Sequence, residues 1–429
     1  MCCWKRPIST SLIPNFQKDD ILLALKLIFQ PWKWKGKDTE KVLEEEFKRY
    51  LKVNYAFSFI NGRIAFLAIL KALGIKKGDE ILVQGFTCNA LISPILFLGA
   101  KPVFVDVDDT INMDPVDLKR KITKKSKAIV VQHTFGWPAK IDEIRQIARE
   151  NNLFLIEDCA HSLGAEYKGK KIGTLGDCAF FSFGRDKIIS SIFGGMAVTN
   201  KNEIAQKLKE IQQNGKNPSS FWIIQQLLYP IILRIVILPA YNIHSLLGRI
   251  LFGIFHKSSI LGKAVSKKEK KGEEKYFFQK MPSALASIAL NQFKKLKCFN
   301  EHRREIAEFY KRELRDEHFF LPLGIKEENI YAVFMRFPVL VDLSTDMLLR
   351  ESRKERMYLN DGWRKTPVVP PDTDISKMGY FSGACPKAEK IAERLINLPT
   401  HINITQKEAQ KIVAFLRKQK QENKKYGDK

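Results

Sequence analysis

Residues 156–200 read IEDCAHSLGAEYKGKKIGTLGDCAFFSFGRDKIISSIFGGMAVTN. An apolar run at residues 153–156 ends at the acidic pair Glu157 and Asp158, and a second apolar run, CAFFSF, leads to Lys187 and then to two adjacent glycines. A lysine set among apolar and glycine residues suggests an amine that acts as a nucleophile, because burial lowers its pKa and favours condensation with an aldehyde. A lone lysine at such a junction is more often an ordinary surface residue, so the order of the surrounding motifs decides between the two interpretations.

The motifs around Lys187 resemble, in their order, the DegT/DnrJ/EryC1/StrS family of pyridoxal phosphate (PLP) dependent sugar aminotransferases. Members of this family share E-D, a His or Gln three residues later, G-A, G-x-x-G-D, F-S-F, a lysine five residues after that serine, and G-G-x-x-x-T. This chain has these motifs as Glu157-Asp158, His161, Gly164-Ala165, residues 173–177, residues 181–183, Lys187, and Gly194-Gly195 with Thr199. The resemblance extends over most of residues 40–418 and breaks near residues 215–275.

Short apolar runs alternate with helical patterns in the first half of the chain. The runs EILVQGF, KPVFVDV, KAIVVQH and LFLIEDC are typical of buried parallel strands, and residues 40–52, 63–72 and 142–150 have helical patterns. This alternation predicts an α/β fold whose ligand lies at the carboxyl ends of the strands. The resemblance implies a fold-type-I PLP-dependent transferase, with a large doubly wound, mostly parallel sheet domain and a smaller C-terminal α+β domain.

We divide the chain into four parts on this basis. Residues 1–39 form an N-terminal arm, and residues 40–214 form the large PLP-binding domain. Residues 215–275 are an apolar and basic insertion, which is either a membrane-surface element or a lid. Residues 276–429 form the C-terminal small domain.

The resemblance implies roles for four polar residues of the 156–200 block. Lys187 condenses with the aldehyde of the cofactor and then carries a proton between the substrate carbon and the cofactor. Asp158 pairs with the protonated pyridine nitrogen, although its local sequence also fits a helix N-cap. His161 lies near the 3′-oxygen of the cofactor, and Ser182 binds its phosphate.

A second segment begins at Gly62 and completes the predicted phosphate site. The turn Gly62-Arg63-Ile64 opens a helix whose N-terminal amides can hold a phosphate dianion. The family prefers threonine or serine where this chain has Arg63, so Arg63 either contacts the phosphate through its charge or points elsewhere. Phe86 is the aromatic residue expected to stack on the pyridine ring. Cys88 is the alternative, because the spacing that follows is two residues longer than the common one.

Residues 278–281 depart from the family pattern. They read F-Q-K-M where many members have N-Y-R-M, whose asparagine reaches the phosphate bound by the neighbouring subunit. A homodimer is still expected, because such sites are completed across a two-fold interface. The asparagine contact cannot be transferred to this chain, in which Gln279 or Lys280 would take its place.

Residues 221–255 are far more apolar than the corresponding family region. A membrane-spanning helix needs about 20 continuous apolar residues, and this segment is interrupted by Gln225, Gln226, Pro230, Arg234 and Pro239. Two interpretations remain. The segment is either a subunit-interface or lid helix pair, or an amphipathic element that enters the headgroup region while Arg249, His256, Lys257 and the basic run from Lys263 bind anionic lipid.

The composition limits the classes of partner and site. The chain has 429 residues, a net charge of +25 and 45% hydrophobic residues, so it is not mainly disordered. Its basic residues are spread along the chain without a nucleic-acid-binding motif, so no nucleic-acid partner is expected. The seven cysteines have neither paired nor metal-like spacing, which predicts a reducing cytoplasm and no metal site. If the insertion binds lipid, the protein lies at the inner face of the membrane.

The resemblance implies PLP-dependent transamination of a keto sugar. The acceptor is a keto sugar, expected to be nucleotide-linked, and the amino donor is glutamate or glutamine, in surface polysaccharide or amino-sugar synthesis. Dehydratase-like members share the fold but replace the lysine with histidine, so Lys187 disfavours that alternative. A membrane-associated, non-catalytic member is the other alternative, which the altered positions at Arg63 and Phe278 leave open.

Overall fold

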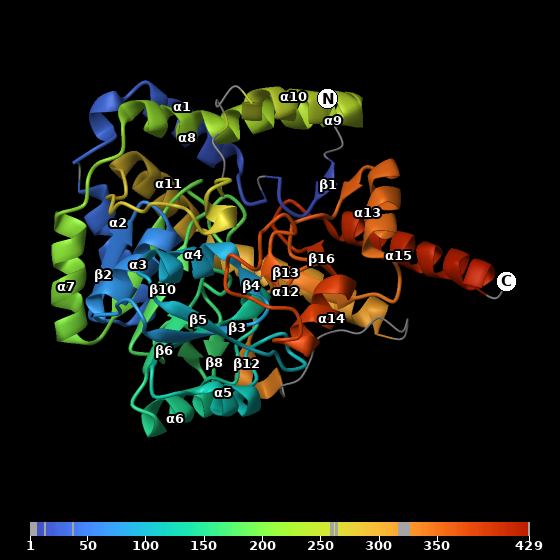
Figure 1. Cartoon of the computed structure of the whole chain (residues 1–429). Helices are drawn as coiled ribbons and strands as arrows, with labels where there is room; N and C mark the ends of the chain where they lie inside the picture. Colours follow the sequence, from blue (N-terminus) through green and yellow to red (C-terminus); the bar gives the residue numbers. More distant parts are fainter. Residues whose placement is uncertain are drawn as a thin grey trace.

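The computed structural model describes residues 7–12, 14–36, 38–257, 261, 265–315 and 327–427, and a seven-stranded sheet lies at its centre (Figure 1). The strand order is β2 (Tyr55–Phe59), β11 (Gly195–Thr199), β10 (Cys178–Ser182), β7 (Phe154–Asp158), β6 (Ser126–Gln132), β3 (Glu80–Gln84) and β5 (Lys101–Val105). Neighbouring strands run parallel except at β11, which is antiparallel to both β2 and β10. This mostly parallel sheet confirms the predicted fold class.

Helices cover both faces of the sheet. One face carries α3 (Gly62–Ala72), α4 (Asn89–Phe97) and α7 (Asn202–Gln213), and the other carries α2 (Thr39–Leu51), α5 (Pro115–Lys121) and α6 (Ile141–Glu150). Side chains alternate between the faces, so Ile129 and Val131 of β6 belong to one core while Ala128 and Val130 belong to the other. The helices predicted at residues 40–52, 63–72 and 142–150 are α2, α3 and α6.

A smaller α+β unit follows in the last third of the chain. β13 (Arg336–Leu340) and β16 (Leu395–Pro399) pair antiparallel. The helices of this unit are α12 (Leu296–Leu314), α13 (Thr345–Lys354), α14 (Pro386–Arg394) and α15 (Gln406–Gly427). Residues of α12, α13, α15 and the two strands form a third core of their own.

Short strands connect the small unit with the rest of the chain. The pairs are β1 (Ile8–Ser9) with β14 (Met357–Tyr358), β4 (Thr87–Cys88) with β15 (Val368–Val369), and β12 (Ile330–Tyr331) with β8 (Glu166–Tyr167), which also pairs with β9 (Lys170–Lys171). The short helices are η1 (Pro31–Lys33), η2 (Thr134–Gly136), η4 (Glu269–Lys271) and η5 (Glu327–Asn329). The arm also contains α1 (Lys18–Ile28), which packs on α11 (Ser283–Phe293), and α11 shares the core of α2.

The apolar insertion forms helices along one edge of the molecule, beside α1 (Figure 1). α8 (Ser220–Ile232), a π-helical turn η3 (Leu233–Ile237) and α9 (Leu238–Ile243) follow one another without a break, and α10 (Ser245–Lys257) comes next. The 24 residues Ser220–Ile243 are long and apolar enough, by length and composition, to cross a membrane. The sequence analysis disfavoured a spanning helix because polar residues and prolines interrupt the apolar run, but the segment forms one continuous helix with a π-helical turn between its prolines. Ile223, Leu227, Leu233 and Ile237 are fully buried, so one side packs on the core.

Glu157 holds the loop that leads into β10. Its fully buried carboxylate accepts hydrogen bonds from the backbone N–H groups of Gly173 at 2.8 Å, Leu175 at 2.6 Å and Gly176 at 2.7 Å. Glu157 therefore supports the local backbone.

We therefore expect Glu157→Ala to destabilise the fold without changing the chemistry of the cavity. Three buried amides would lose their acceptor at about 1 kcal/mol or more each, and the thermal midpoint of unfolding should fall by about 5 °C. The control is Glu166→Ala, which removes a partly exposed pair with Lys171 and should change the midpoint by less than about 2 °C. Equal midpoints for the two variants would contradict this role of Glu157.

Candidate active site

Lys187 lies in the turn after β10, at the carboxyl end of the sheet. A cavity of about 570 Å³ opens beside it, and a smaller hollow of about 80 Å³ continues inward. The two hollows share the residues Gly62, Arg63, Cys88, Ala90, Ser182, Lys187 and Trp363. Of the predicted site residues, the structure thus brings Gly62, Arg63, Ser182 and Lys187 to one continuous cavity, and Asp158 and His161 line its inner part.

Asp158 is the acid of the inner hollow. Its Oδ1 accepts a hydrogen bond from the N–H of Ala160 at 2.9 Å, and no described residue donates to Oδ2. Burial raises the pKa of Asp158 to about 6, against the opposing effects of the Ala160 hydrogen bond, Lys187 and His133. One oxygen therefore supports a local turn and caps no helix, since no helix begins at residues 159–165, and the other is not engaged by a described residue.

His161 is held as a neutral imidazole. Its ring stacks on Phe135 with centroids 5.8 Å apart and planes 6° apart, and its Nδ1 accepts the Phe135 N–H at 3.4 Å. Burial lowers the pKa of His161 well below its usual value, and Lys187 and Arg336 add to the shift. A neutral ring with Nδ1 as acceptor carries its proton on Nε2, so His161 can donate a hydrogen bond to an oxygen in the hollow.

The N-terminus of α3 meets Ser182 at Gly62. A Cβ atom on Gly62 would lie 2.9 Å from the Cβ of Ser182, so the approach requires glycine. The amide of Ile64 was expected to be free for a phosphate, but it donates to the side chain of Asn61 at 2.9 Å. This N-cap corrects the role of Ile64, because Asn61 satisfies one of the first amides of the helix. Gly62, the first residue of the helix, lines the inner hollow at this end.

Arg63 lines the cavity but already has a carboxylate partner. Its guanidinium forms an ion pair with Glu269 of η4, whose side chain is 2% exposed. Tyr276 also donates its hydroxyl to Glu269 at 3.3 Å. Of the two alternatives for Arg63, the structure thus shows contact with Glu269, and the insertion supplies that partner.

Phe86 does not line either hollow. It is fully buried and packs edge-to-face on Phe135 and Trp363, with centroids 6.4 and 5.5 Å away. Cys88, the alternative, lines both hollows. The prediction for Phe86 is therefore corrected: residues 86–88 turn into β4, and this turn directs Phe86 into the core and Cys88 to the cavity. Burial raises the pKa of the Cys88 thiol, so it is protonated at neutral pH.

Residues from distant parts of the chain hold the backbone around Lys187. Asn15 of the arm donates its side-chain amide to the carbonyl of Lys187. Arg303 of α12 is 1% exposed and donates to Asn15 Oδ1 at 2.6 Å and to the carbonyl of Ile188 at 2.8 Å. Burial lowers the pKa of Arg303 to about 9. Sequence motifs gave no signal for these two residues, because their contacts join segments far apart in the chain.

The small unit contributes Trp363, which the sequence analysis also missed. Trp363 lines both hollows and meets the His161 ring edge-on at 4.8 Å. Next to Lys187, Asp186 pairs with Arg336 of β13, and Arg336 pairs with Asp361 at 2.9 Å. Although burial opposes it, Arg336 holds the pKa of Asp186 below its usual value.

His133, Glu157 and Cys159 offer ligand atoms within 4.8 Å of one another, which is the spacing of a metal site. These atoms already have partners, however. Glu157 accepts the three backbone amides described above, and Nδ1 of His133 accepts the N–H of Ala139 at 3.1 Å. The cluster is therefore a hydrogen-bonded support beneath the cavity. His133 is fully buried in this cluster.

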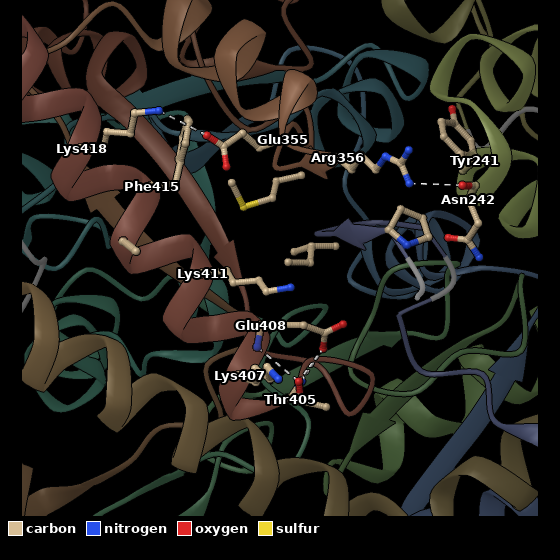
Figure 2. Close-up of a pocket in the computed structure, with 14 residues that line it drawn as sticks. Tyr241, Asn242, Glu355, Arg356, Thr405, Lys407, Glu408, Lys411, Phe415 and Lys418 are labelled. Atoms are coloured by element: carbon tan, nitrogen blue, oxygen red, sulfur yellow. Dashed lines mark hydrogen bonds and ion pairs between the residues drawn. The ribbon is translucent and has the colours of Figure 1, made fainter. Parts of the chain in front are cut away.

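A larger cavity of about 730 Å³ lies elsewhere, between α15, β1 and the end of α9 (Figure 2). Two of its charged groups pair, since Lys418 lies 3.8 Å from Glu355, and Glu408 accepts the N–H and the hydroxyl of Thr405. Arg356 donates to the carbonyl of Asn242 at 3.3 Å. None of the predicted site residues lines this cavity, so the chemistry belongs to the cavity at Lys187.

Comparison with known proteins agrees with this geometry. MJ1066 of Methanocaldococcus jannaschii is 30% identical and covers 97% of this chain and 100% of its own. GDP-perosamine synthase of Escherichia coli O157:H7 is 29% identical over 85% of each chain. Among solved structures, the putative sugar aminotransferase Spr1654 of Streptococcus pneumoniae matches with a TM-score of 0.77 at 21% identity, covering 99% of this chain and 100% of its own, which supports the fold.

The family match omits the middle of the segment at residues 215–275 that the sequence analysis set apart. The model of the DegT/DnrJ/EryC1/StrS aminotransferase family matches residues 16–227 and 256–417, so the unmatched interval falls within α8–α10. The resemblance first seen in the 156–200 block is thereby confirmed. This chain belongs to the DegT/DnrJ/EryC1/StrS aminotransferase family.

Proposed function

We propose that this protein is a PLP-dependent aminotransferase that places an amino group on a nucleotide-linked keto sugar, with glutamate or glutamine as amino donor. The observation that carries this proposal is that Lys187 and Asp158 line one hollow with Ser182 and the start of α3. Relatives named GDP-perosamine synthase and dTDP-3-amino-3,6-dideoxy-alpha-D-galactopyranose transaminase support the substrate class. A relative named spore coat polysaccharide biosynthesis protein SpsC supports a role in polysaccharide synthesis.

The residues of the cavity fit PLP. The cofactor supplies an electron sink that stabilises negative charge at the substrate carbon. Asp158 would hold its carboxylate against the pyridine nitrogen, and His161 would donate its Nε2 proton to the ring oxygen. Ser182 and the positive N-terminal end of α3 would bind the phosphate. Lys187 is the amine that carries the cofactor and moves the proton.

The first test is the visible absorbance of the purified protein. The wild type should be coloured with PLP, and borohydride should fix the cofactor covalently on Lys187, as peptide mass analysis would show. Lys187→Ala should lose the visible band while it stays folded, and glutamate should change the wild-type spectrum. A wild type that stays colourless with added PLP would remove the enzyme proposal. A coloured protein whose spectrum no amino donor changes would remove transamination.

The second test concerns pH. With the pKa of Asp158 raised to about 6 in the cofactor-free protein, its carboxyl gains a proton as the pH falls through 6. Pairing with a protonated pyridine nitrogen requires the carboxylate, so the affinity for PLP should fall by up to about tenfold per pH unit below pH 6. Asp158→Asn should bind PLP more weakly at pH 8 and lack this part of the pH dependence.

PLP titrations of both proteins between pH 5 and pH 8 would measure the effect. The phosphate of PLP titrates in the same range, but it does so equally with both proteins, so their difference isolates Asp158. Parallel pH profiles for the two proteins would contradict the assignment.

We also propose a homodimer in the cytoplasm that docks on an anionic membrane surface. Large exposed apolar side chains gather on α1 and on the helices from α8 to α10; we call this set the apolar surface. Its members are Leu22, Leu25, Phe29, Phe221, Ile235, Ile243, Leu246, Leu247, Ile250 and Ile254. Figure 1 shows these helices along one edge of the molecule. A set of exposed apolar side chains of this size, unlike a single exposed residue, marks a site of interaction.

The positive charge of the insertion favours an anionic membrane as the partner that binds the apolar surface. Between Glu210 and Glu269 the sequence has no acidic residue, and its basic residues are Lys216, Arg234, Arg249, Lys257, Lys263, Lys267 and Lys268. Apolar side chains with a basic flank bind the headgroup region of anionic lipid. Lys263 and the side chains of His256 and Lys257 lie outside the described residues, so their share in this contact rests on sequence alone.

Flotation with vesicles tests this docking. The intact protein should float with vesicles that contain anionic phospholipid and stay in solution with zwitterionic vesicles. Ile250→Glu with Ile254→Glu should abolish flotation, whereas a control with Val116→Glu and Phe381→Glu, two exposed apolar residues elsewhere, should not. Sedimentation equilibrium should give a dimer for all three proteins. A monomer only for the Ile250/Ile254 variant would instead make the apolar surface a subunit interface.

A further inference from the structure

The outer part of the cavity collects positive charge. Arg63, Arg185, Lys187 and Lys270 line it, together with apolar side chains that include Tyr229 and Phe252 of the insertion. Two of these cations are neutralised by direct partners, because Arg63 pairs with Glu269 and Lys270 pairs with Asp372. The acidic residues of the lining, Asp186 and Asp361, both pair with Arg336.

Arg185 differs from these cations because it has no carboxylate bound to it in the described part of the chain. Its guanidinium lies 3.9 Å from the Tyr229 ring and 5.4 Å from the Phe193 ring. Its Nε and Nη2 are shielded from solvent and find no hydrogen-bond acceptor among the described residues. Burial lowers the pKa of Arg185 and the nearby Arg63 adds to the shift, although Tyr229 and Asp186 oppose it. Buried donors of this kind are costly unless an acceptor satisfies them.

The position of Arg185 separates it from the cofactor end of the site. Asp158 and His161 line the inner hollow, whereas Arg185 lines only the outer one, towards Tyr229 and Phe252. A substrate whose keto carbon lies at Lys187 extends outward past Arg185. The volume of about 570 Å³ is in the range of cavities that hold ligands much larger than an amino acid.

We propose that Arg185 is a specificity residue that binds the diphosphate of the sugar acceptor through its Nε and Nη2 donors, with Lys270 as a second contact. A guanidinium fork matches two phosphate oxygens in a bidentate contact, which satisfies both buried donors at once. This inference rests on the proposed function and names the group that the outer cavity recognises. A diphosphate can carry either a nucleoside or a prenyl chain, and the apolar side chains from α8 and α10 beside Arg185 are compatible with both.

Binding to the PLP-loaded protein tests this subsite. Calorimetric titrations would use inorganic pyrophosphate, GDP, geranyl diphosphate and, separately, glutamate. Arg185→Gln should weaken binding of the diphosphates at least tenfold more than it weakens glutamate. Arg185→Lys keeps the charge but loses the fork, so its loss should be smaller than that of Arg185→Gln. Arg149→Gln, which removes an exposed arginine of α6, is the matched control and should leave every affinity within twofold.

The outcomes separate the alternatives. A preference for GDP or for geranyl diphosphate supports the subsite and identifies the carrier of the sugar. If Arg185→Gln weakens glutamate and spares the diphosphates, Arg185 binds the donor carboxylate and the inference is overturned. Unchanged binding of all four compounds in Arg185→Gln, with the visible band of PLP intact, would reduce Arg185 to a packing partner of Tyr229. A wild type that shows no PLP band would instead count against the proposed function itself.

Discussion

The active site depends on how closely the N-terminus of α3 approaches the ends of β10 and β11. A Cβ on Gly62 would lie 2.9 Å from Ser182 Cβ, and a Cβ on Gly195 would lie 2.4 Å from the carbonyl carbon of Asn61. Neither separation is tolerated by real side chains, so both glycines are required by the same contact. Their approach places the positive end of a buried helix beside Ser182, five residues before Lys187. The anchor for a phosphate and the position of the lysine therefore depend on one packing arrangement.

The turn that carries Lys187 is held on both sides by buried arginines. Arg303 and Asn15 fix the carbonyls of Lys187 and Ile188, and Arg336 binds the carboxylate of Asp186. Because these contacts are made to the backbone and to a neighbouring side chain, the amine of Lys187 is not consumed by them. A fixed backbone with an unoccupied amine suits a group that must carry a proton over short distances.

Local sequence patterns predicted the large domain and the centre of the site well. Alternating apolar runs have a direct physical meaning in a parallel sheet, and Asp158 and Ser182 stand at the ends of strands that the pattern identifies. The patterns could not find Asn15, Arg303, Arg336 and Trp363, since these act through contacts between remote segments. Ile64 and Phe86 were misjudged for a local reason. The Asn61 cap and the turn into β4 are decided by side-chain packing, which the order of motifs does not reveal.

The insertion was the part of the chain least accessible to prediction, and it is also the part that shapes the outer cavity. Its polar and proline residues disfavoured a spanning helix, but Ser220–Ile243 forms one continuous helix that includes a π-helical turn. Glu269, at the end of the same region, neutralises Arg63. Arg63 stands where the family prefers threonine or serine, and a residue of the insertion therefore neutralises the positive charge that it adds.

This compensation explains why Arg63 and Arg185 can face one cavity. Two uncompensated guanidinium groups in a partly buried space would repel each other and lower the stability of the fold. With Arg63 paired to Glu269 and Lys270 paired to Asp372, Arg185 keeps a positive charge that no carboxylate of the described residues binds, over the ring of Tyr229. The insertion thus has two connected effects. It neutralises Arg63 beside the predicted phosphate site, and it places apolar side chains around Arg185 in the outer cavity. In such apolar surroundings Arg185 would bind a phosphate oxygen most strongly.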